Sequence, residues 1–377
     1  MQGKMNFKEI EQCAKCGLCL AACPVYKELI LERYSPRGKV QLASFYEKGD
    51  LELSESYRES FSKCLLCGAC KLTCPGGIDP NAIVEQMRKE IVSEKGLGDK
   101  QKSLVQSLLE HHNISGEDNE ERGDWREFLE DLPDHGYLRE QAEIVFFVGC
   151  VSSFYPMVQK IPQNMVRIME RAGADFTILG GEEYCCGYPL IGAGVPDKAG
   201  ELMDHNLRKI KDSRAEKVVF SCPTCYLTWK KNYDTDIELL HSTQFIHSLI
   251  EEGRLRFRDM GEIKVTYHDP CDLGRKGGIF DPPRRIIESI PSLSLVEMAN
   301  HKMNSVCCGG GGNLETDAED LVEILARRKL DDIKESGVDL VVSACQQCVR
   351  TIATRAIRQK SDLKVMDITE LVCQAME

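Results

Sequence analysis

The cysteines of this chain follow two local patterns, and each pattern is written twice. The chain has 377 residues and 19 cysteines, and all but Cys373 belong to these repeats. The first pattern is Cys13, Cys16, Cys19 and Cys23-Pro24, which recurs as Cys64, Cys67, Cys70 and Cys74-Pro75. The second is Cys150, Cys185-Cys186-Gly187, Cys222 and Cys225, which recurs as Cys271, Cys307-Cys308-Gly309, Cys345 and Cys348. Such spacings are typical of metal ligation, so the chain is predicted to carry metal clusters.

The first pattern has the spacing of bacterial ferredoxins that hold two clusters. In that arrangement the fourth cysteine of each motif ligates the cluster of the other motif. One cubane 4Fe-4S cluster is therefore expected on Cys13, Cys16, Cys19 and Cys74, and a second on Cys64, Cys67, Cys70 and Cys23. Zinc is the alternative occupant, because zinc is commonly held by four cysteines.

The second pattern has one cysteine more than a cubane needs. Its landmarks recur 121, 122 and 123 positions later, which indicates an internal duplication with small insertions. Gly187 and Gly309 are expected where the backbone needs a positive φ or a close approach. The tetraglycine stretch 309–312 suggests either an open wall beside the second site or a flexible turn. An odd ligand count predicts an unusual cluster.

The chain is predicted to have an α/β fold behind a helical N-terminal domain. Helices are expected from Pro36 to Tyr46 and from Ala82 to Val92. Further on, apolar strands are expected to lead to cysteines at 144–148, 218–220, 264–267 and 340–342, with another strand at 175–179. Strands that alternate with helices predict parallel sheets, whose ligands collect at the carboxyl ends of the strands.

The expected domain boundaries follow these changes in pattern. The predicted parts are a helical ferredoxin domain at 1–92, a polar and partly helical linker at 93–141, a first α/β domain at 142–262 and a second at 263–377. In the linker, Trp125, Phe128 and Leu132 are expected to hold the segment against a neighbouring domain. Cys373 is expected to be a small buried apolar side chain.

Composition excludes several classes of protein. A net charge of −12 argues against a nucleic-acid ligand, which needs clustered Lys and Arg. The charged N-terminus, Met1 to Glu9, lacks the apolar stretch of a signal peptide, and no apolar run is long enough to cross a bilayer. Cysteines in ligand spacing indicate a reducing compartment. We therefore expect a cytoplasmic protein, with any membrane association made through a partner.

The two five-cysteine segments resemble a known family. Cys150, Cys185-Cys186-Gly187 and Cys222-Pro-Thr-Cys225 are similar to a CCG domain, and so are His268-Asp-Pro-Cys271, Cys307-Cys308-Gly309 and Cys345-Gln-Gln-Cys348. Tandem CCG domains are found in heterodisulfide reductase catalytic subunits. With the ferredoxin motifs in front, the whole chain resembles the iron-sulfur subunits of the glycolate oxidase, glycerol-3-phosphate dehydrogenase, lactate utilisation and heterodisulfide reductase D-like group.

The resemblance implies that each five-cysteine set binds a noncubane 4Fe-4S cluster, and that the two CCG domains are tandem, pseudo-duplicated α/β units. Zinc or a simpler cluster in one of the two sites is the alternative. His268 is placed to donate a proton to a leaving thiolate or to hydrogen-bond a cluster sulfur, and a structural role for it is equally open. His268, Cys307 and Cys308 are the candidate catalytic residues.

No nucleotide-binding or flavin-binding fingerprint is found in the sequence. Hydride chemistry is therefore expected on another polypeptide, a flavoprotein dehydrogenase or an electron-transfer flavoprotein. The leading hypothesis is an iron-sulfur electron-transfer subunit that delivers electrons to a quinone, a disulfide or another protein. The rival hypothesis is a catalytic disulfide reductase with a substrate pocket at the tetraglycine stretch, and a structural zinc protein is a third.

Overall fold

The computed structural model describes residues 10–377, which form two compact units. Unit 1 contains the chain up to Val105 together with Pro189–Lys198 and Val306–Lys329. Unit 2 contains Gln106–Tyr188, Ala199–Ser305 and Leu330–Glu377. The N-terminal residues 1–9, on which the expectation of no signal peptide was based, lie outside the described part.

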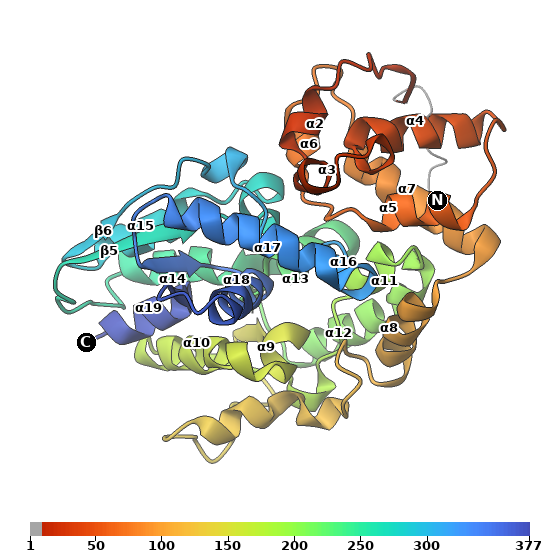
Figure 1. Cartoon of the computed structure of the whole chain (residues 1–377). Coiled ribbons are helices and arrows are strands. Elements are labelled where there is room, and N and C mark those ends of the chain that lie inside the picture. Colours follow the sequence, from red (N-terminus) through yellow and green to blue (C-terminus); the bar gives the residue numbers. More distant parts are fainter. Residues whose placement is uncertain (1–9) are drawn as a thin grey trace. The chain divides into compact units, whose positions relative to one another are not determined.

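The N-terminal part of unit 1 is helical, as predicted, and residues 10–105 of the described chain contain no strand. The helices, coloured red to orange in Figure 1, are α2 (Leu18–Ala22), α3 (Pro24–Leu29), η1 (Glu32–Tyr34), α4 (Pro36–Glu47), α5 (Glu55–Ser62), α6 (Ala69–Leu72) and α7 (Pro80–Lys95), followed by the start of α8 (Asp99–Glu110). Their core is formed by apolar side chains of α4, α5 and α7, including Val40, Phe61 and Met87.

Local sequence explains where the two predicted helices begin. Ser35 caps α4, because its hydroxyl accepts a hydrogen bond from the backbone N–H of Gly38 at 2.8 Å, and Pro36 occupies the first turn. Asp79 caps α7 in the same way, with Pro80 next to it. Both helix predictions are confirmed, and both helices extend slightly beyond the predicted ranges.

Unit 2 contains two parallel four-stranded sheets, which confirms the α/β prediction. The first sheet has the order β2-β1-β3-β4 and the second has the order β6-β5-β7-β8. The strands are β1 (Ile144–Phe147), β2 (Phe176–Thr177), β3 (Lys217–Phe220), β4 (Glu238–His241), β5 (Ile263–His268), β6 (Leu293–Leu295), β7 (Leu340–Ser343) and β8 (Lys364–Asp367). Strands β4, β6 and β8 were not predicted.

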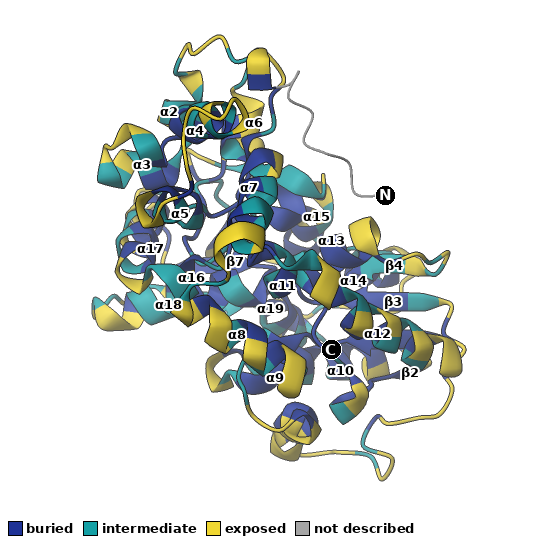
Figure 2. Cartoon of the chain, turned by 90° about the vertical axis from the view of Figure 1, so that its right-hand side faces the viewer, coloured by how far each residue is buried: buried dark blue, intermediate teal, exposed yellow. Residues whose placement is uncertain are grey.

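Helices and short turns of helix connect these strands. In the first half they are η2 (Asn119–Phe128), α9 (Cys150–Phe154), η3 (Pro156–Val158), α10 (Lys160–Arg171), η4 (Gly180–Glu182), α11 (Tyr188–Gly192), η5 (Pro196–Ala199), α12 (Gly200–Asp212), α13 (Pro223–Asn232) and α14 (Ser242–Glu251). In the second they are η6 (Asp272–Lys276), α15 (Asp281–Ser289), η7 (Lys302–Asn304), α16 (Leu314–Asp317), α17 (Glu319–Lys334), α18 (Gln346–Arg358) and α19 (Ile368–Ala375). Strands β1 and β7 are buried along their whole length, and Figure 2 shows where such buried residues lie.

The two sheets are related by corresponding contacts. Helix α10, which follows β1, packs against α19 at the end of the second half. Helix α15, which follows β5, packs against α14 at the end of the first half. In each half, the long helix that follows the first strand therefore packs against the last helix of the other half.

The polar segment predicted as a linker is only partly peripheral. Trp125 is fully buried, so its expected role of holding the segment in place is confirmed. Phe128 and Leu132 are 69% and 41% exposed, so the same expectation is wrong for them. Cys373 is half-buried.

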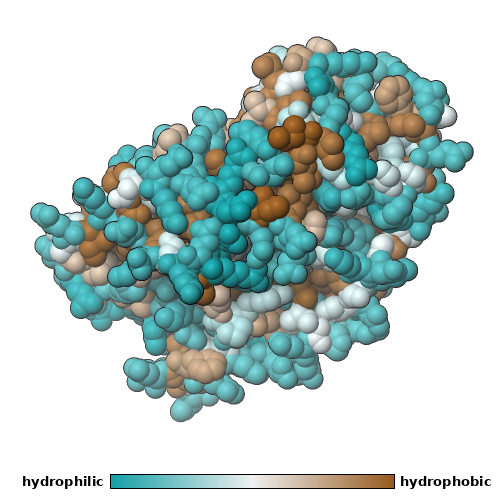
Figure 3. Space-filling model, in the orientation of Figure 1, coloured by the Kyte–Doolittle hydropathy of each residue, from teal (hydrophilic) through white to brown (hydrophobic). Residues whose placement is uncertain are grey.

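The face of the molecule in Figure 3 is mostly hydrophilic, with apolar side chains in small groups. Within residues 10–377, no helix combines the length and the apolar character needed to span a bilayer.

Candidate metal centres

In each five-cysteine set, two cysteines follow neighbouring strands. They are the first cysteine of the set and the first cysteine of its Cys-x-x-Cys pair. Cys150 follows β1 and Cys222 follows β3, and these strands pair through Phe147 and Phe220. Cys271 and Cys345 follow β5 and β7 in the same way. In the first sheet β2 lies beside β1 on one side of this pair and β4 lies beside β3 on the other, and β6 and β8 flank β5 and β7 in the same way. Open parallel sheets bind ligands at such a point, where the strand order reverses.

The five cysteines of the first set are brought together within unit 2. Hydrogen bonds between side chains connect them in the series Cys150, Cys185, Cys186, Cys225 and Cys222. All five are buried. The hydrogen bond with Cys185, together with burial, raises the pKa of the Cys150 thiol, whereas hydrogen bonds from Cys185 and Cys225 lower the pKa of Cys186.

Glycines allow the backbone to approach this cluster of thiols. Gly149 has a φ of +81°, and a Cβ atom there would lie 3.3 Å from the sulfur of Cys225. Gly187 has a φ of +92°, and a Cβ atom there would lie 2.8 Å from Met203. The expected need for glycine after each double cysteine is confirmed, because Gly309 has a φ of +97°.

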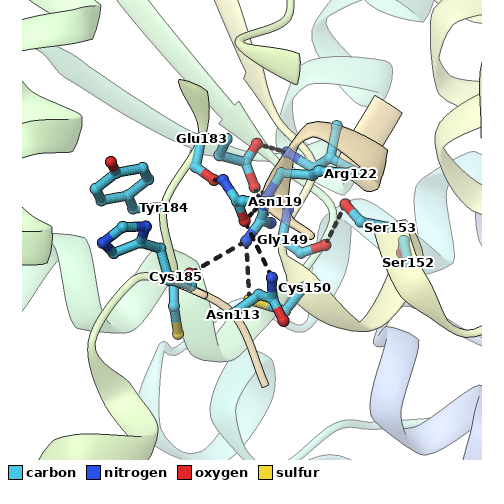
Figure 4. Close-up of polar contacts among 12 residues, drawn as sticks. Asn113, Asn119, Arg122, Gly149, Cys150, Ser152, Ser153, Glu183, Tyr184 and Cys185 are labelled. Atoms are coloured by element: carbon cyan, nitrogen blue, oxygen red, sulfur yellow. Dashed lines mark hydrogen bonds and ion pairs between the residues drawn. The ribbon is translucent and has the colours of Figure 1, made fainter. Parts of the chain in front are cut away.

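A buried ion pair lies beside Cys150 (Figure 4). Arg122 donates a hydrogen bond from Nη2 to the sulfur of Cys150 at 3.4 Å, and its Nη1 is 2.9 Å from Oε1 of Glu183. Glu183 also accepts hydrogen bonds from the backbone N–H groups of Val148 and Gly149, at 2.7 and 2.8 Å. The carboxylate of Glu183 therefore fixes both the arginine and the turn that leads to Cys150.

The segment that carries Arg122 also supports Cys185. Asn119 donates hydrogen bonds to the carbonyl oxygens of Gly181 and Glu183, and the backbone N–H of Cys185 donates to the carbonyl oxygen of His112 at 2.8 Å. The ring of His112 stacks on that of Tyr184. Sequence reasoning assigned no role to these residues. The sequence offered one signal for such a role, which was the presence of Arg122, Asn113 and Asn119 in the charged segment before the first strand.

In the second set, Cys271, Cys345 and Cys348 lie in unit 2, whereas Cys307 and Cys308 belong to a stretch of unit 1. His268 ends β5, is buried, and has a ring nitrogen within 4.8 Å of the sulfur of Cys348.

The other polar residues near Cys271 are engaged in ion pairs. Asp269 forms a bidentate ion pair with Arg284, whose Nη1 and Nη2 lie 2.8 and 2.9 Å from the two carboxylate oxygens. The sulfur of Cys271 contacts Oδ1 of Asp272 at 3.7 Å, and Asp272 in turn pairs with Lys276 at 2.8 Å. Among the described contacts, the sulfur of Cys271 thus faces a carboxylate, whereas that of Cys150 faces a guanidinium.

The two halves exchange hydrogen bonds through their Cys-x-x-Cys loops. Gln346, between Cys345 and Cys348, donates to the carbonyl oxygen of Val148 at 2.7 Å and to the hydroxyl of Ser221 at 2.8 Å. Thr224, between Cys222 and Cys225, donates to Asp272 at 2.6 Å. Each loop is therefore supported by residues that flank cysteines of the other half.

The tetraglycine stretch is not an open wall. A Cβ atom on Gly312 would lie 2.4 Å from the carbonyl oxygen of Cys64, and one on Gly309 would lie 2.8 Å from Cβ of Leu325. Gly311 and Gly312 are needed because the backbone of Cys64 and Leu65 packs directly against them, and Gly309 is needed because Leu325 does so. The expectation of a substrate wall beside the second site is wrong.

The cysteines of the ferredoxin part form two neighbourhoods. Besides burial, the thiolates of Cys67, Cys64 and Cys23 raise the pKa of Cys70, and those of Cys13 and Cys74 raise the pKa of Cys19. A cavity is lined by Cys23, Cys64, Cys67 and Cys70, with Lys39 at its wall. The structure thus brings together Cys23, Cys64, Cys67 and Cys70 of the second predicted set, and Cys13, Cys19 and Cys74 of the first.

The two ferredoxin loops also share one backbone conformation. Lys15 and Leu66 are equivalent residues with φ of 56° and 51°, and Gly17 and Gly68 follow with φ of 80° and 77°. Each glycine then begins a short helix, α2 or α6, that carries the third cysteine of its motif.

The residues of the ferredoxin part and of the first five-cysteine site fit clusters that are bound by thiolates. The ferredoxin cavity is lined by four cysteines and holds the buried ammonium of Lys39. The thiols of the first five-cysteine site are buried, and the guanidinium of Arg122 donates to one of them. Cation and N–H donors around sulfur compensate the negative charge that cluster thiolates carry.

Comparison with known proteins agrees with this arrangement. A cysteine-rich domain family matches residues 144–230 and again residues 265–353, and a 4Fe-4S dicluster domain family matches residues 9–78. The chain is 31% identical to the D subunit of the dihydromethanophenazine:CoB--CoM heterodisulfide reductase of Methanosarcina barkeri, over 99% of this chain and 95% of that protein. The chain belongs to the heterodisulfide reductase D family of iron-sulfur proteins.

Two further comparisons concern proteins with other names. A protein of Syntrophomonas wolfei named EtfAB:quinone oxidoreductase is 26% identical over 100% of this chain and 59% of that protein. A crystal structure of a hypothetical protein from Helicobacter pylori has a TM-score of 0.62 at 10% identity, over 90% of this chain and 68% of that one, and shows a shared fold. The family confirms the sequence-based expectation of an iron-sulfur subunit of an oxidoreductase.

Proposed function

We propose that this chain relays single electrons from a flavoprotein partner through two cubane clusters to clusters in the five-cysteine sites, and onward to a quinone, a disulfide or a protein acceptor. Bound iron-sulfur clusters would supply the one-electron chemistry. The chain itself would hold their ligands, exclude water from them and connect them. The name of the Syntrophomonas wolfei relative supports an electron-transfer flavoprotein as the donor.

The entry point for electrons is proposed at the first cubane set. Cys16 is exposed, whereas Cys67, its equivalent in the second motif, is buried. Helices α2 and α6 of the two motifs pack together, and their Leu18 and Leu72 side chains are 55% and 43% exposed. An exposed ligand and exposed apolar side chains on the same pair of short helices and their loops suit transient docking of a redox protein.

The contact between Cys64 and the tetraglycine stretch carries the proposal. Arg88, on α7, is buried and donates from Nη2 to the carbonyl oxygens of Ser62 and Cys64 at 3.0 Å. Its Nη1 donates to the carbonyl oxygens of Gly312 and Gly192 at 2.9 Å. One side chain thus connects a ligand of the second cubane set to the segment that follows Cys307-Cys308-Gly309, within unit 1.

Each five-cysteine set is proposed to hold a noncubane 4Fe-4S cluster. The first set is complete within unit 2 and has more thiols than a cubane uses. The common strand order, the corresponding helix contacts and the exchange of hydrogen bonds support an origin of the two halves by duplication of one module. Domains at 142–262 and 263–377 follow from that duplication.

The second candidate is a catalytic disulfide reductase. The similarity to the heterodisulfide reductase of Methanosarcina barkeri over 99% of the chain favours it. His268, close to Cys348, is the proton donor that this function would use. Gly311 and Gly312, in the stretch where a pocket was first expected, are packed against the backbone of Cys64 and Leu65.

The deciding experiment uses the full chain, reconstituted with iron and sulfide without oxygen. The relay predicts that a co-purified flavoprotein reduces the clusters and that Arg88→Met slows the transfer of electrons beyond the cubanes without loss of iron. Arg58→Met is the matched control, since Arg58 donates to the carbonyl oxygen of Gly96 at the end of the same helix. Turnover of disulfides with a chemical electron donor would instead establish the catalytic function. Unchanged transfer in Arg88→Met would contradict the relay path.

A further inference from the structure

We propose that Arg122 is a positioning residue that raises the reduction potential of the first five-cysteine site. It would do so by directing its charge at Cys150. This inference rests on the proposed function, because it assumes that the first site holds a redox-active cluster. It goes further, because it assigns the tuning of that site's potential to one buried side chain.

The geometry gives Arg122 one fixed orientation. Its side chain is 1% exposed. The guanidinium uses Nη1 for Glu183 and Nη2 for the sulfur of Cys150, and it lies over the ring of Phe154 at 5.3 Å. Nε donates to Oδ1 of Asn119 at 3.3 Å. A guanidinium held on all sides cannot turn away from the sulfur when the charge there changes.

Glu183 does not cancel the effect of Arg122 at the sulfur. Its carboxylate is occupied by Arg122 and by the N–H groups of Val148 and Gly149. The donor that reaches the sulfur of Cys150 belongs to the arginine, at 3.4 Å. The sulfur therefore has a cationic donor as its hydrogen-bond partner, while the carboxylate is bound by the arginine and by two backbone N–H groups.

A cationic donor at a ligand sulfur favours the reduced state of the bound group. Reduction adds a negative charge, and a nearby positive charge stabilises it most where water is excluded. Hydrogen bonds to cluster sulfurs act in the same direction. Arg122 should therefore raise the reduction potential of the first site.

The second half lacks this arrangement among the described contacts of Cys271. The sulfur of Cys271 faces Oδ1 of Asp272 at 3.7 Å, and the positive charge of Lys276 pairs with that carboxylate. Arg284, the buried arginine of this half, is bound to Asp269 and Glu297. A carboxylate beside the ligand disfavours added negative charge. Cys271 thus contacts the carboxylate of an Asp272–Lys276 ion pair, whereas Cys150 contacts the guanidinium of the Arg122–Glu183 pair.

The test is a redox titration followed by electron paramagnetic resonance, in a Cys271→Ser Cys348→Ser background that leaves the first site as the only complete five-cysteine site. Arg122→Met should shift the equilibrium between the oxidised and reduced first site toward the oxidised form by about tenfold, which is ~59 mV for one electron. Arg122→Lys keeps the charge and should fall between Met and the unmodified side chain. Arg284→Met is the matched control, because it removes a buried arginine that contacts no cysteine in the described structure, and it should leave the first-site potential unchanged.

The outcomes separate this inference from the proposed function. Iron missing from the first site of the unmodified chain would sink the proposed function and this inference with it. Full iron content with the same potential in Arg122→Met, or an equal shift in Arg284→Met, would overturn only the role of Arg122. If Arg122→Met loses its iron, the result for Arg122→Lys decides: a lowered potential supports the inference, and an unchanged one refutes it.

Discussion

The side-chain amide of Gln346 donates a hydrogen bond to the carbonyl oxygen of Val148, and the two atoms lie 2.7 Å apart. Gln346 stands inside the Cys-x-x-Cys loop of the second half, and Val148 lies two residues before the first cysteine of the first half. Thr224 and Asp272 make the corresponding contact in the other direction. The two halves therefore depend on each other at their cysteine loops.

Replacing Gln346 should test this dependence. Gln346→Leu leaves the buried carbonyl of Val148 without its donor, so we expect a loss of about 1–3 kcal/mol of unfolding free energy. Urea unfolding of the apoprotein measures the loss, and iron analysis should show lower occupancy of the first site. Gln347→Leu is the control, because Gln347 bonds Thr351 one turn along its own helix. Equal effects of the two substitutions would contradict the proposed link.

Gly312→Ala should be far more harmful than an alanine at a comparable glycine. The new Cβ atom would lie 2.4 Å from the carbonyl oxygen of Cys64, so the two backbones would have to separate. Gly337 has the same φ of +68°, and a Cβ atom there would meet no other atom within 4 Å, so Gly337→Ala carries only the cost of the left-handed backbone. That cost is roughly 1–2 kcal/mol, and overpacking should add about 1–3 kcal/mol at Gly312. Thermal unfolding of both variants gives the difference, and equal losses would contradict the close contact.

The membership of the two cubane sets can be tested by pairing variants. If the fourth cysteine of each motif ligates the cluster of the other motif, Cys23→Ser and Cys67→Ser should remove the same electron paramagnetic resonance signal. Cys16→Ser and Cys74→Ser should remove the other. Cys373→Ser should leave both signals and the iron content intact, because Cys373 lies outside every motif. A spectrum in which Cys23→Ser matches Cys16→Ser would show that each motif keeps its own fourth ligand.

Two equivalent helix caps should make opposite contributions to the pH dependence of stability. His241 caps α14 and Asp367 caps α19, each as part of a capping box. Burial lowers the pKa of His241 to about 3 and raises the pKa of Asp367 to about 7. The unfolded values are about 6.5 for His and about 3.9 for Asp. The stability that His241 contributes is thus lost as the pH falls below about 6.5, and that of Asp367 is lost as the pH rises from about 3.9 toward 7.

Asparagine at each cap keeps a capping side chain and removes the titration. Relative to the unmodified chain, Asp367→Asn should gain stability as the pH rises from 5 to 7, by about 2 kcal/mol. His241→Asn should lose relative stability as the pH rises from 5 to 6.5. Urea midpoints measured across this range give both slopes, and slopes of the same sign would refute the assignment.

Local sequence determined the elements that could be predicted. Strands β1, β3, β5 and β7 are apolar runs whose ends are marked by cysteines, and such runs are recognisable because most of their residues are buried. Strands β4 and β8 carry exposed residues at their outer ends, and β6 has three residues, so none of them has a strong apolar pattern. The glycines after the double cysteines were predictable because their φ values are a local requirement.

Contacts between distant segments could not be predicted in the same way. Arg122 lies 28 residues before Cys150, in a charged run that resembles a solvated surface. Its partner Glu183 lies 61 residues further along the chain, so only the folded chain shows that the two form a buried pair. The tetraglycine stretch has a sequence that fits an open turn as well as a tightly packed one, and the choice depends on Cys64 and Leu65 in another part of the chain.

Unit 1 is assembled from three separate stretches, and the last of them ends at Lys329. During synthesis the ferredoxin part leaves the ribosome first, but the segment that contacts Cys64 emerges only after most of unit 2. Contacts between segments far apart in sequence slow folding, and the early segment lacks its partner until the late one has been synthesised. A cell that loads clusters into the ferredoxin motifs before release of the chain would therefore load them into an unfinished unit, whose final closure follows the synthesis of residues 306–329.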